Sequence, residues 1–222
     1  MCFSATASFA MGGALVPLGV LALIKARQLG PHWVPFAIYP LAFGIQQGFE
    51  GLAWIAINSG DDALLFCGSR GFLFFSHFFW PAFAPVSVWL SEPDPRRKRL
   101  LGWLSVIGVA YGALIYLPAL VWPGWTIVEV VQHSLVYKTP ALYEYPVFRV
   151  LTRVIYAAIV LGGLFLSTRP EIKLFACLIA ASLAFTFVFY AYAFISVWCF
   201  FAAILSLYLL GVILREGRRV QS

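Results

Sequence analysis

The 222-residue sequence predicts an all-α protein whose helices form a bundle across a membrane, and three observations support this fold class. Hydrophobic residues make up 62% of the chain and charged residues 11%, with a mean hydropathy of +0.90, which excludes a soluble globular domain. The apolar residues fall in runs of about 20, the length that an α-helix needs to cross a bilayer. Basic residues gather at the ends of these runs, so the net charge of +6 reflects membrane topology and no nucleic-acid partner is expected.

The apolar runs predict about seven spans within one transmembrane domain that covers residues 1–222. The first run has no basic segment before it and carries Lys25 and Arg27 after it, so we expect it to be a retained span and not a cleaved signal peptide. The boundary near residues 190–193 is weakly marked, and joining the last two spans would leave six. In chain order, the predicted spans are 4–26, 35–58, 71–90, 100–121, 148–166, 172–190 and 194–214.

The distribution of lysine and arginine predicts the orientation of the bundle. Basic residues follow the first, third, fifth and seventh spans, at Lys25, Arg27, Arg96, Arg97, Lys98, Arg99, Arg169, Lys173, Arg215, Arg218 and Arg219. The opposite connections hold only Arg70, Lys138 and Arg149, with acidic residues beside them. By the positive-inside rule, the N-terminus lies outside and the C-terminus in the cytoplasm. We therefore expect a multi-pass protein of the inner (plasma) membrane, with the lipid bilayer as its first partner.

The long connection at 122–148 predicts an amphipathic segment on the outer face. Apolar residues recur at helical spacing between 127 and 136, whereas Glu129, Gln132 and His133 cluster on one stripe. Two interpretations stay open. The segment is either an interfacial helix with a solvated polar face or a lid whose Glu129 and His133 face the mouth of the bundle.

Two ionisable residues inside the spans predict a site. A carboxylate such as Glu50 costs at least about 2.5–3.5 kcal/mol at the centre of a membrane helix, so it is normally paired, neutralised or bound to metal. At the rise of an α-helix, Glu50 lies about 12 Å and His77 about 9 Å from the predicted outer ends of their helices. Their similar depths favour one outward-facing site. The alternative is structural: a protonated Glu50 that packs against a neighbouring helix and a His77 that is simply hydrogen-bonded.

Residues around Glu50 are expected to complete this site. Gln46 and Glu50 are four residues apart and share a helix face, which Gln47 and Trp54 flank, so these three neighbours are candidate cofactor-binding residues. Glycines recur at three- and four-residue spacing, which permits a second helix to approach closely and predicts a central position for this helix: Gly44, Gly48 and Gly51.

Cys2 adds a third candidate metal ligand on the predicted outer side. If the initiator methionine is removed, Cys2 presents a thiol and an α-amine together, a strong chelator of soft or borderline metals. A disulfide with Cys67 or an inert thiol are the alternatives. The metal set would then be Glu50 and His77 with Cys2, Glu129 and His133 in support, and the ion would be zinc or copper. Cys177 and Cys199 fall inside spans and are expected to behave as small apolar residues.

The segments MCFSATASF and PLAFGIQQGFEGLAW resemble a family of bacterial integral membrane proteins of unknown function. In that family the recognisable motifs include the equivalents of Cys2, Ser4, Thr6, Gln46, Gln47, Glu50 and Trp54. The resemblance implies a functional role for these residues and names no substrate. The predicted topology also looks like that of alkaline ceramidases, which hold zinc with three histidines, whereas this chain offers only His77 and His133 on the relevant side.

The leading functional hypothesis is an outward-facing Glu/His site for a metal or cofactor, in a metal-dependent membrane enzyme that acts on a lipid-like substrate. The first alternative is a proton-linked sensor or transporter that uses Glu50 and His77. The second is a structural accessory subunit that packs against partners in a larger membrane complex. Whether the protein is an enzyme stays open at this point.

Overall fold

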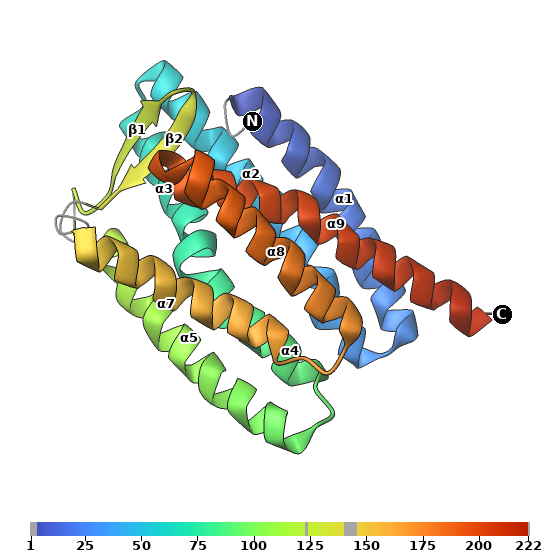
Figure 1. Cartoon of the computed structure of the whole chain (residues 1–222). Helices are drawn as coiled ribbons and strands as arrows, with labels where there is room; N and C mark the ends of the chain where they lie inside the picture. Colours follow the sequence, from blue (N-terminus) through green and yellow to red (C-terminus); the bar gives the residue numbers. More distant parts are fainter. Residues whose placement is uncertain (1–3, 123, 140–145, 222) are drawn as a thin grey trace.

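The computed structural model describes residues 4–122, 124–139 and 146–221, and these residues form a bundle of seven helical segments with one β-hairpin at its end (Figure 1). Six of the segments are long and apolar enough to cross a membrane. The predicted all-α bundle is therefore confirmed. The bounds are α1 Ala5–Leu29, α2 Val34–Ser59, α3 Asp62–Leu73, η2 Phe74–Phe79, α4 Trp80–Ser91, α5 Pro95–Val121, α7 Pro146–Phe165, α8 Pro170–Phe189 and α9 Phe194–Gln221.

The helices begin where the sequence supplies capping groups. The Asp61 side chain accepts from the Leu64 backbone N–H at 2.9 Å, and Asp94 does the same for Arg96 at 2.8 Å, which satisfies N–H groups that a helix start leaves open. With Asp61 as its cap, α3 begins at Asp62, nine residues before the predicted start of this span at residue 71. The segments α3, η2 and α4 follow one another as a single span over Asp62–Ser91.

The last two helices are separate, as the seven-span prediction required. Tyr190, with φ −133° and ψ 32°, interrupts α8, and the 3₁₀ turn η3 (Ala191–Ala193) leads into α9. No proline or glycine marks this break in the sequence, which is why its position was hard to predict.

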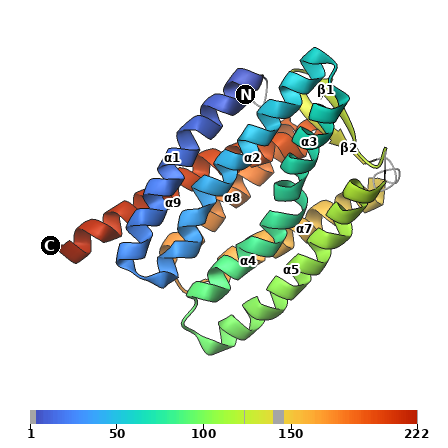
Figure 2. The same ribbon diagram turned by 180° about the vertical axis from the view of Figure 1, so that it is seen from behind.

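The helix α2 lies at the centre of the bundle, where it packs against α1, α3 and α9 (Figure 2). At 26 residues it is as long as the spans. It coincides with the predicted span 35–58 but, with Gln46, Gln47 and Glu50 in its sequence, it is not among the six helices of the described residues that are apolar enough to cross a membrane. Burial inside the protein removes the need for a lipid-compatible surface. The approach of α1 is so close that a Cβ added at Gly19 would lie 2.4 Å from the Leu41 backbone nitrogen.

The glycine prediction for α2 is confirmed at two of its three positions. A Cβ at Gly44 would lie 2.9 Å from the Val16 nitrogen of α1, and one at Gly51 would lie 2.8 Å from the Phe9 ring. Gly48 has no such neighbour within 4 Å. The helices α4, α5 and α7 pack together beside this group, and α8 joins α7 to α9.

The predicted amphipathic helix in the 122–148 segment is wrong, because this part of the chain forms an antiparallel hairpin. The strands β1 (Ile127–Val131) and β2 (Ser134–Lys138) pair with Val131 opposite Ser134. Gln132 and His133 form the two-residue turn, with φ of 47° and 59°. β-branched residues favour strands, and positive φ at both turn positions matches the right-handed twist of a hairpin. The turn sequence lacks the asparagine and glycine that usually signal such a turn.

Candidate functional site

Glu50 lies in the centre of the bundle with its side chain fully buried. The Ser196 hydroxyl, in the first turn of α9, donates a hydrogen bond to Glu50 Oε1. Both residues are 0% exposed, so the pair is screened from bulk water. A buried carboxyl group that accepts a hydrogen bond from a hydroxyl is sensitive to protonation and to any ligand that displaces that hydroxyl.

Gln46 and Cys199 extend this polar centre. The Trp80 indole N–H donates to Gln46 Oε1 at 2.8 Å, which links α2 to the start of α4. The Cys199 thiol lies beside the Gln46 amide and near Glu50. We call the group of Gln46, Glu50, Ser196 and Cys199 the carboxyl centre.

Gln47 borders α1 and is also fully buried. Neither its amide nitrogen nor its amide oxygen has a hydrogen-bond partner among the described residues. The nearest part of α1 is Gly12, where an added Cβ would lie 3.7 Å from Gln47 Cβ. One helical turn before Gly12, the buried Ser8 hydroxyl likewise has no hydrogen-bond partner in the described part of the chain. Buried polar groups of this kind are normally satisfied by water or a bound group.

His77 lies in η2, a short π-helical turn within the third span. Such turns widen a helix and frequently occur at functional sites. The imidazole Nδ1 is 2.9 Å from the Ser76 hydroxyl, and the ring borders a small void that Cys199 also borders. His77 and Glu50 lie on two different helical segments, and their predicted joint site stays a prediction.

The predicted metal ligands lie on several elements: Glu50 on α2, His77 in η2, Glu129 in β1 and His133 in the turn of the hairpin. No three His, Cys, Asp or Glu side chains come together as metal ligands within 4–122, 124–139 and 146–221. Cys2 lies outside the described residues, so its predicted role as a ligand stays a prediction. The described cysteines are free thiols: Cys67 and Cys177 are exposed and Cys199 is buried.

Glu129 and His133 do not line up on a helix as the sequence suggested. Glu129 lies in β1 and forms an ion pair with Lys138 of β2. His133 is exposed in the turn between the strands. Because Glu129 lies in a strand and His133 in the turn that follows it, the two residues no longer form one helical stripe that faces the mouth of the bundle.

Trp54 belongs to the apolar packing beneath the hairpin. Its side chain is 6% exposed and lies in one cluster with Phe72, Leu135 and Tyr137. The Phe72 and Tyr137 rings stack with their centroids 4.8 Å apart. Trp54 thus helps to attach the hairpin to the bundle, and its predicted contact with a cofactor stays a prediction.

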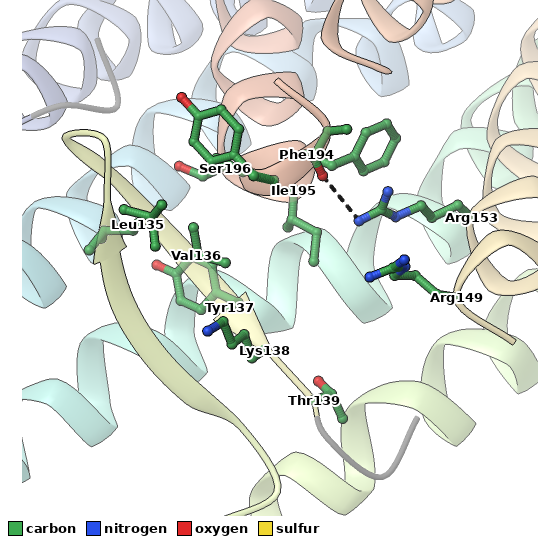
Figure 3. A pocket seen from close by; sticks show the side chains of 14 residues that line it. Leu135, Val136, Tyr137, Lys138, Thr139, Arg149, Arg153, Phe194, Ile195 and Ser196 are labelled. Carbon is green, nitrogen blue, oxygen red and sulfur yellow. Dashed lines mark hydrogen bonds between the residues drawn. The ribbon is translucent and has the colours of Figure 1, made fainter. Parts of the chain in front are cut away.

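A cavity of about 770 Å³ opens beside the hairpin, and Ser196 of the carboxyl centre is among the residues that line it (Figure 3). Its walls come from β2, the start of α7, η3 and the first turn of α9. Ser196 is part of the wall, so the cavity ends one side chain short of Glu50. This volume lies within the range of about 300–1,000 Å³ that is typical of small-molecule sites.

Sequence reasoning missed Ser196 and did not place Cys199 beside Glu50; the structure confirms that Cys199 is a small buried residue in an apolar cluster. Both lie in a long apolar run, where a serine and a cysteine are ordinary residues and carry no spacing signal. The only available hint was the weakly marked break at 190–193, because polar residues in the first turn after a break lie near the membrane surface.

Comparison with known proteins places the whole chain in one family. Residues 1–222 match DUF6629, a family of unknown function, and the chain therefore belongs to it. No curated protein matches the chain. No solved structure matches it either.

Proposed function

We propose that this member of the DUF6629 family is a multi-pass membrane protein in which Glu50 takes up or releases a proton when a ligand enters the cavity beside the hairpin. The position of Ser196 carries this proposal. Its hydroxyl donates to Glu50, and Ser196 is a fully buried residue that borders the cavity. A ligand that accepts a hydrogen bond from the same hydroxyl takes that bond away from Glu50. The free energy needed to ionise the buried carboxyl group then changes.

The unsatisfied amide of Gln47 supports a polar occupant near Glu50. Gln47 and Glu50 are three residues apart on α2 and therefore lie on adjoining parts of one face. Because both amide atoms of Gln47 are buried without a described partner, a water molecule or a polar ligand group would remove an energetic penalty there.

The buried polar groups favour a sensor that exchanges protons with one side of the membrane over a transporter. Beyond Gln46, the next buried hydrogen bond joins the Tyr39 hydroxyl to the Ser87 hydroxyl at 2.9 Å. The Trp80 ring lies between these groups, 5.4 Å from the Tyr39 ring and 3.9 Å from that of Phe43. An indole N–H donates and does not accept a hydrogen bond, so it cannot relay protons. With the orientation predicted by the basic residues, the exchange is with the outer side.

Infrared difference spectroscopy tests this proposal. A protonated carboxyl group shows a carbonyl stretch that disappears when pH is raised, and we expect a band of this kind that is absent from Glu50→Gln. Gln47→Leu is the control, because it leaves the carboxyl group in place. A wild-type spectrum identical to that of Glu50→Gln at every pH would refute the proposal.

The hypothesis of a metal-dependent enzyme predicts a different result in the same samples. Stoichiometric zinc or copper that is lost in both Glu50→Gln and His77→Ala would establish a metal centre in place of a proton site. A carbonyl band that persists after chelator treatment supports the proton site.

A further inference from the structure

Two arginines give the rim of the cavity its positive charge. Arg149 and Arg153 of α7 line it together with Lys138 of β2, whose charge is balanced by the ion pair with Glu129, and no acidic residue appears in the described part of the wall. Figure 3 shows Arg149 and Arg153 extending from α7 toward β2 and the start of α9. The cavity also adjoins the first turn of α9, where the helix dipole adds positive potential.

The arginine nearest to α9 is held in place by the protein. The Arg153 guanidinium lies over the Phe194 ring, 4.6 Å from the ring centroid, and donates to the Ala191 carbonyl oxygen at 3.4 Å. These contacts fix the position of the guanidinium beside the cavity before any ligand binds. The side chain therefore loses little further conformational entropy on binding. A fixed guanidinium is well suited to a phosphate or carboxylate.

Below the rim, an apolar path continues between α7 and α9. A void of about 40 Å³ shares Arg153, Phe194 and Ile195 with the cavity. It also shares Tyr156, Trp198 and Cys199 with a deeper void of about 30 Å³. Aliphatic and aromatic side chains line the deep end, among them Val160, Leu164, Phe175 and Ile179. The packing between these two helices is thus incomplete along a line that starts at the basic rim.

We propose that the cavity binds the anionic head group of a lipid, with an acyl chain lying along the gap between α7 and α9. The charge of the rim selects the head group, and the apolar path selects an attached chain over a water-soluble anion. The voids themselves are smaller than a chain, so binding requires the Tyr156 and Trp198 side chains to move apart. This lipid is the ligand of the function proposed above, and the inference rests on that function for its effect on Glu50.

Trp198 provides a local probe of the chain. The protein is placed in nanodiscs of zwitterionic lipid that contain a small fraction of phosphatidylglycerol with brominated acyl chains, which quench tryptophan fluorescence on contact. The quenching due to Trp198 is the difference between the wild type and Trp198→Phe. We expect it to exceed the quenching by brominated phosphatidylcholine at the same fraction.

Substitutions at the rim distinguish lipid binding at a specific site from general electrostatic attraction to the membrane. A basic residue near an anionic surface contributes about fivefold in affinity, so Arg149→Gln with Arg153→Gln should weaken binding by about 25-fold. Arg99→Gln is the matched control, since Arg99 is exposed at the start of α5, away from the hairpin. Equal quenching by the two lipids, or an equal loss in the control, would overturn the inference.

Inorganic phosphate distinguishes a lipid from a free anion. Phosphate should leave the quenching by brominated phosphatidylglycerol unchanged, whereas full competition by phosphate would show a site for soluble anions and would also overturn the inference. The infrared measurement remains independent. A pH-dependent Glu50 band without selective quenching would leave the proton site standing and remove the lipid, and the reverse result would remove only the proton site.

Discussion

Two buried glutamates in this protein illustrate how surroundings decide the role of a residue. Glu92, between α4 and α5, is 3% exposed, and its carboxylate accepts from the Thr168 backbone N–H at 2.9 Å and the Asp94 N–H at 3.2 Å. It therefore ties two connecting segments together at the opposite end of the bundle from the hairpin. Glu50 has instead a serine hydroxyl at the wall of a cavity. The first arrangement is structural, and the second can respond to a ligand.

At the residue scale, Ser196→Ala tests the bond at the cavity wall. We expect a loss of about 1–3 kcal/mol in the free energy of unfolding, because the buried carboxyl group loses its donor, and a shift of the Glu50 carbonyl band. Ser206→Ala is the matched control on the same helix. Its hydroxyl is equally buried but donates only to the Ala203 carbonyl oxygen of its own turn. Equal effects of the two substitutions on the band would contradict the assignment.

His32, in the turn η1 (Pro31–Trp33) between α1 and α2, predicts a pH dependence of stability. Partial burial, and then the nearby Arg169 guanidinium, hold the pKa of His32 below its ordinary value of 6.5. As pH falls below about 6.5, the unfolded chain binds a proton that the folded protein resists, so the free energy of unfolding decreases. Thermal unfolding in detergent should show this decrease until the lower folded-state pKa is passed. The His32→Gln variant should lack this part of the pH dependence, and an unchanged profile in the variant would rule out His32 as its source.

At the scale of elements, the hairpin shows where local sequence reasoning failed. The β-branched residues at four of the five positions in 127–131 fit a strand as well as one side of a helix, and length did not decide between them. Tertiary contacts favour the strand over the helix, because four consecutive residues of β2, from Ser134 to Tyr137, are buried against the bundle. Burial of this kind depends on neighbours far away in the chain, which no local pattern records.

The turn of the hairpin can be improved by a substitution that would harm a helix. Gln132 and His133 both have positive φ, a conformation that costs a non-glycine residue about 1–2 kcal/mol. Gln132→Asn with His133→Gly should therefore raise the free energy of unfolding by about 1 kcal/mol. If the segment were helical, the glycine would instead lower it by about 1 kcal/mol. Thermal unfolding distinguishes the two signs.

The contact between α1 and α2 depends on glycine at one position and not at another. At an open helical position, Gly→Ala stabilises by about 0.5–1 kcal/mol, as we expect for Gly13→Ala, where nothing lies within 4 Å. Gly19→Ala should instead destabilise by about 1–3 kcal/mol, because its new Cβ would meet the backbone of Leu41. If both variants gain stability in detergent, the close approach of these helices is incorrect.

At the scale of the whole molecule, composition predicted the bundle and failed to predict the site in full. Apolar runs locate the spans because lipid imposes one length and one hydropathy on every helix that crosses it. The similar depths of Glu50 and His77 predicted one site for both residues, and this joint site stays a prediction. Cys199 lies near Glu50 and lines a small void together with His77. Ser196 and the basic cavity arise from how α7, α9 and the hairpin meet, and the packing of distant segments leaves no trace in a single sequence.

The proposed function requires that Glu50 exchange its proton through the cavity beside the hairpin. In Ile195→Cys, a bulky, membrane-impermeant thiol reagent would block the cavity, because Ile195 lies in its wall. The measurement is the rate at which the Glu50 carbonyl band shifts after transfer to deuterium oxide, before and after labelling. The wild type is the control, since its exposed Cys67 and Cys177 lie away from the cavity. The account predicts that labelling slows exchange in Ile195→Cys and leaves the wild type unchanged, and an unaltered rate in labelled Ile195→Cys would contradict it.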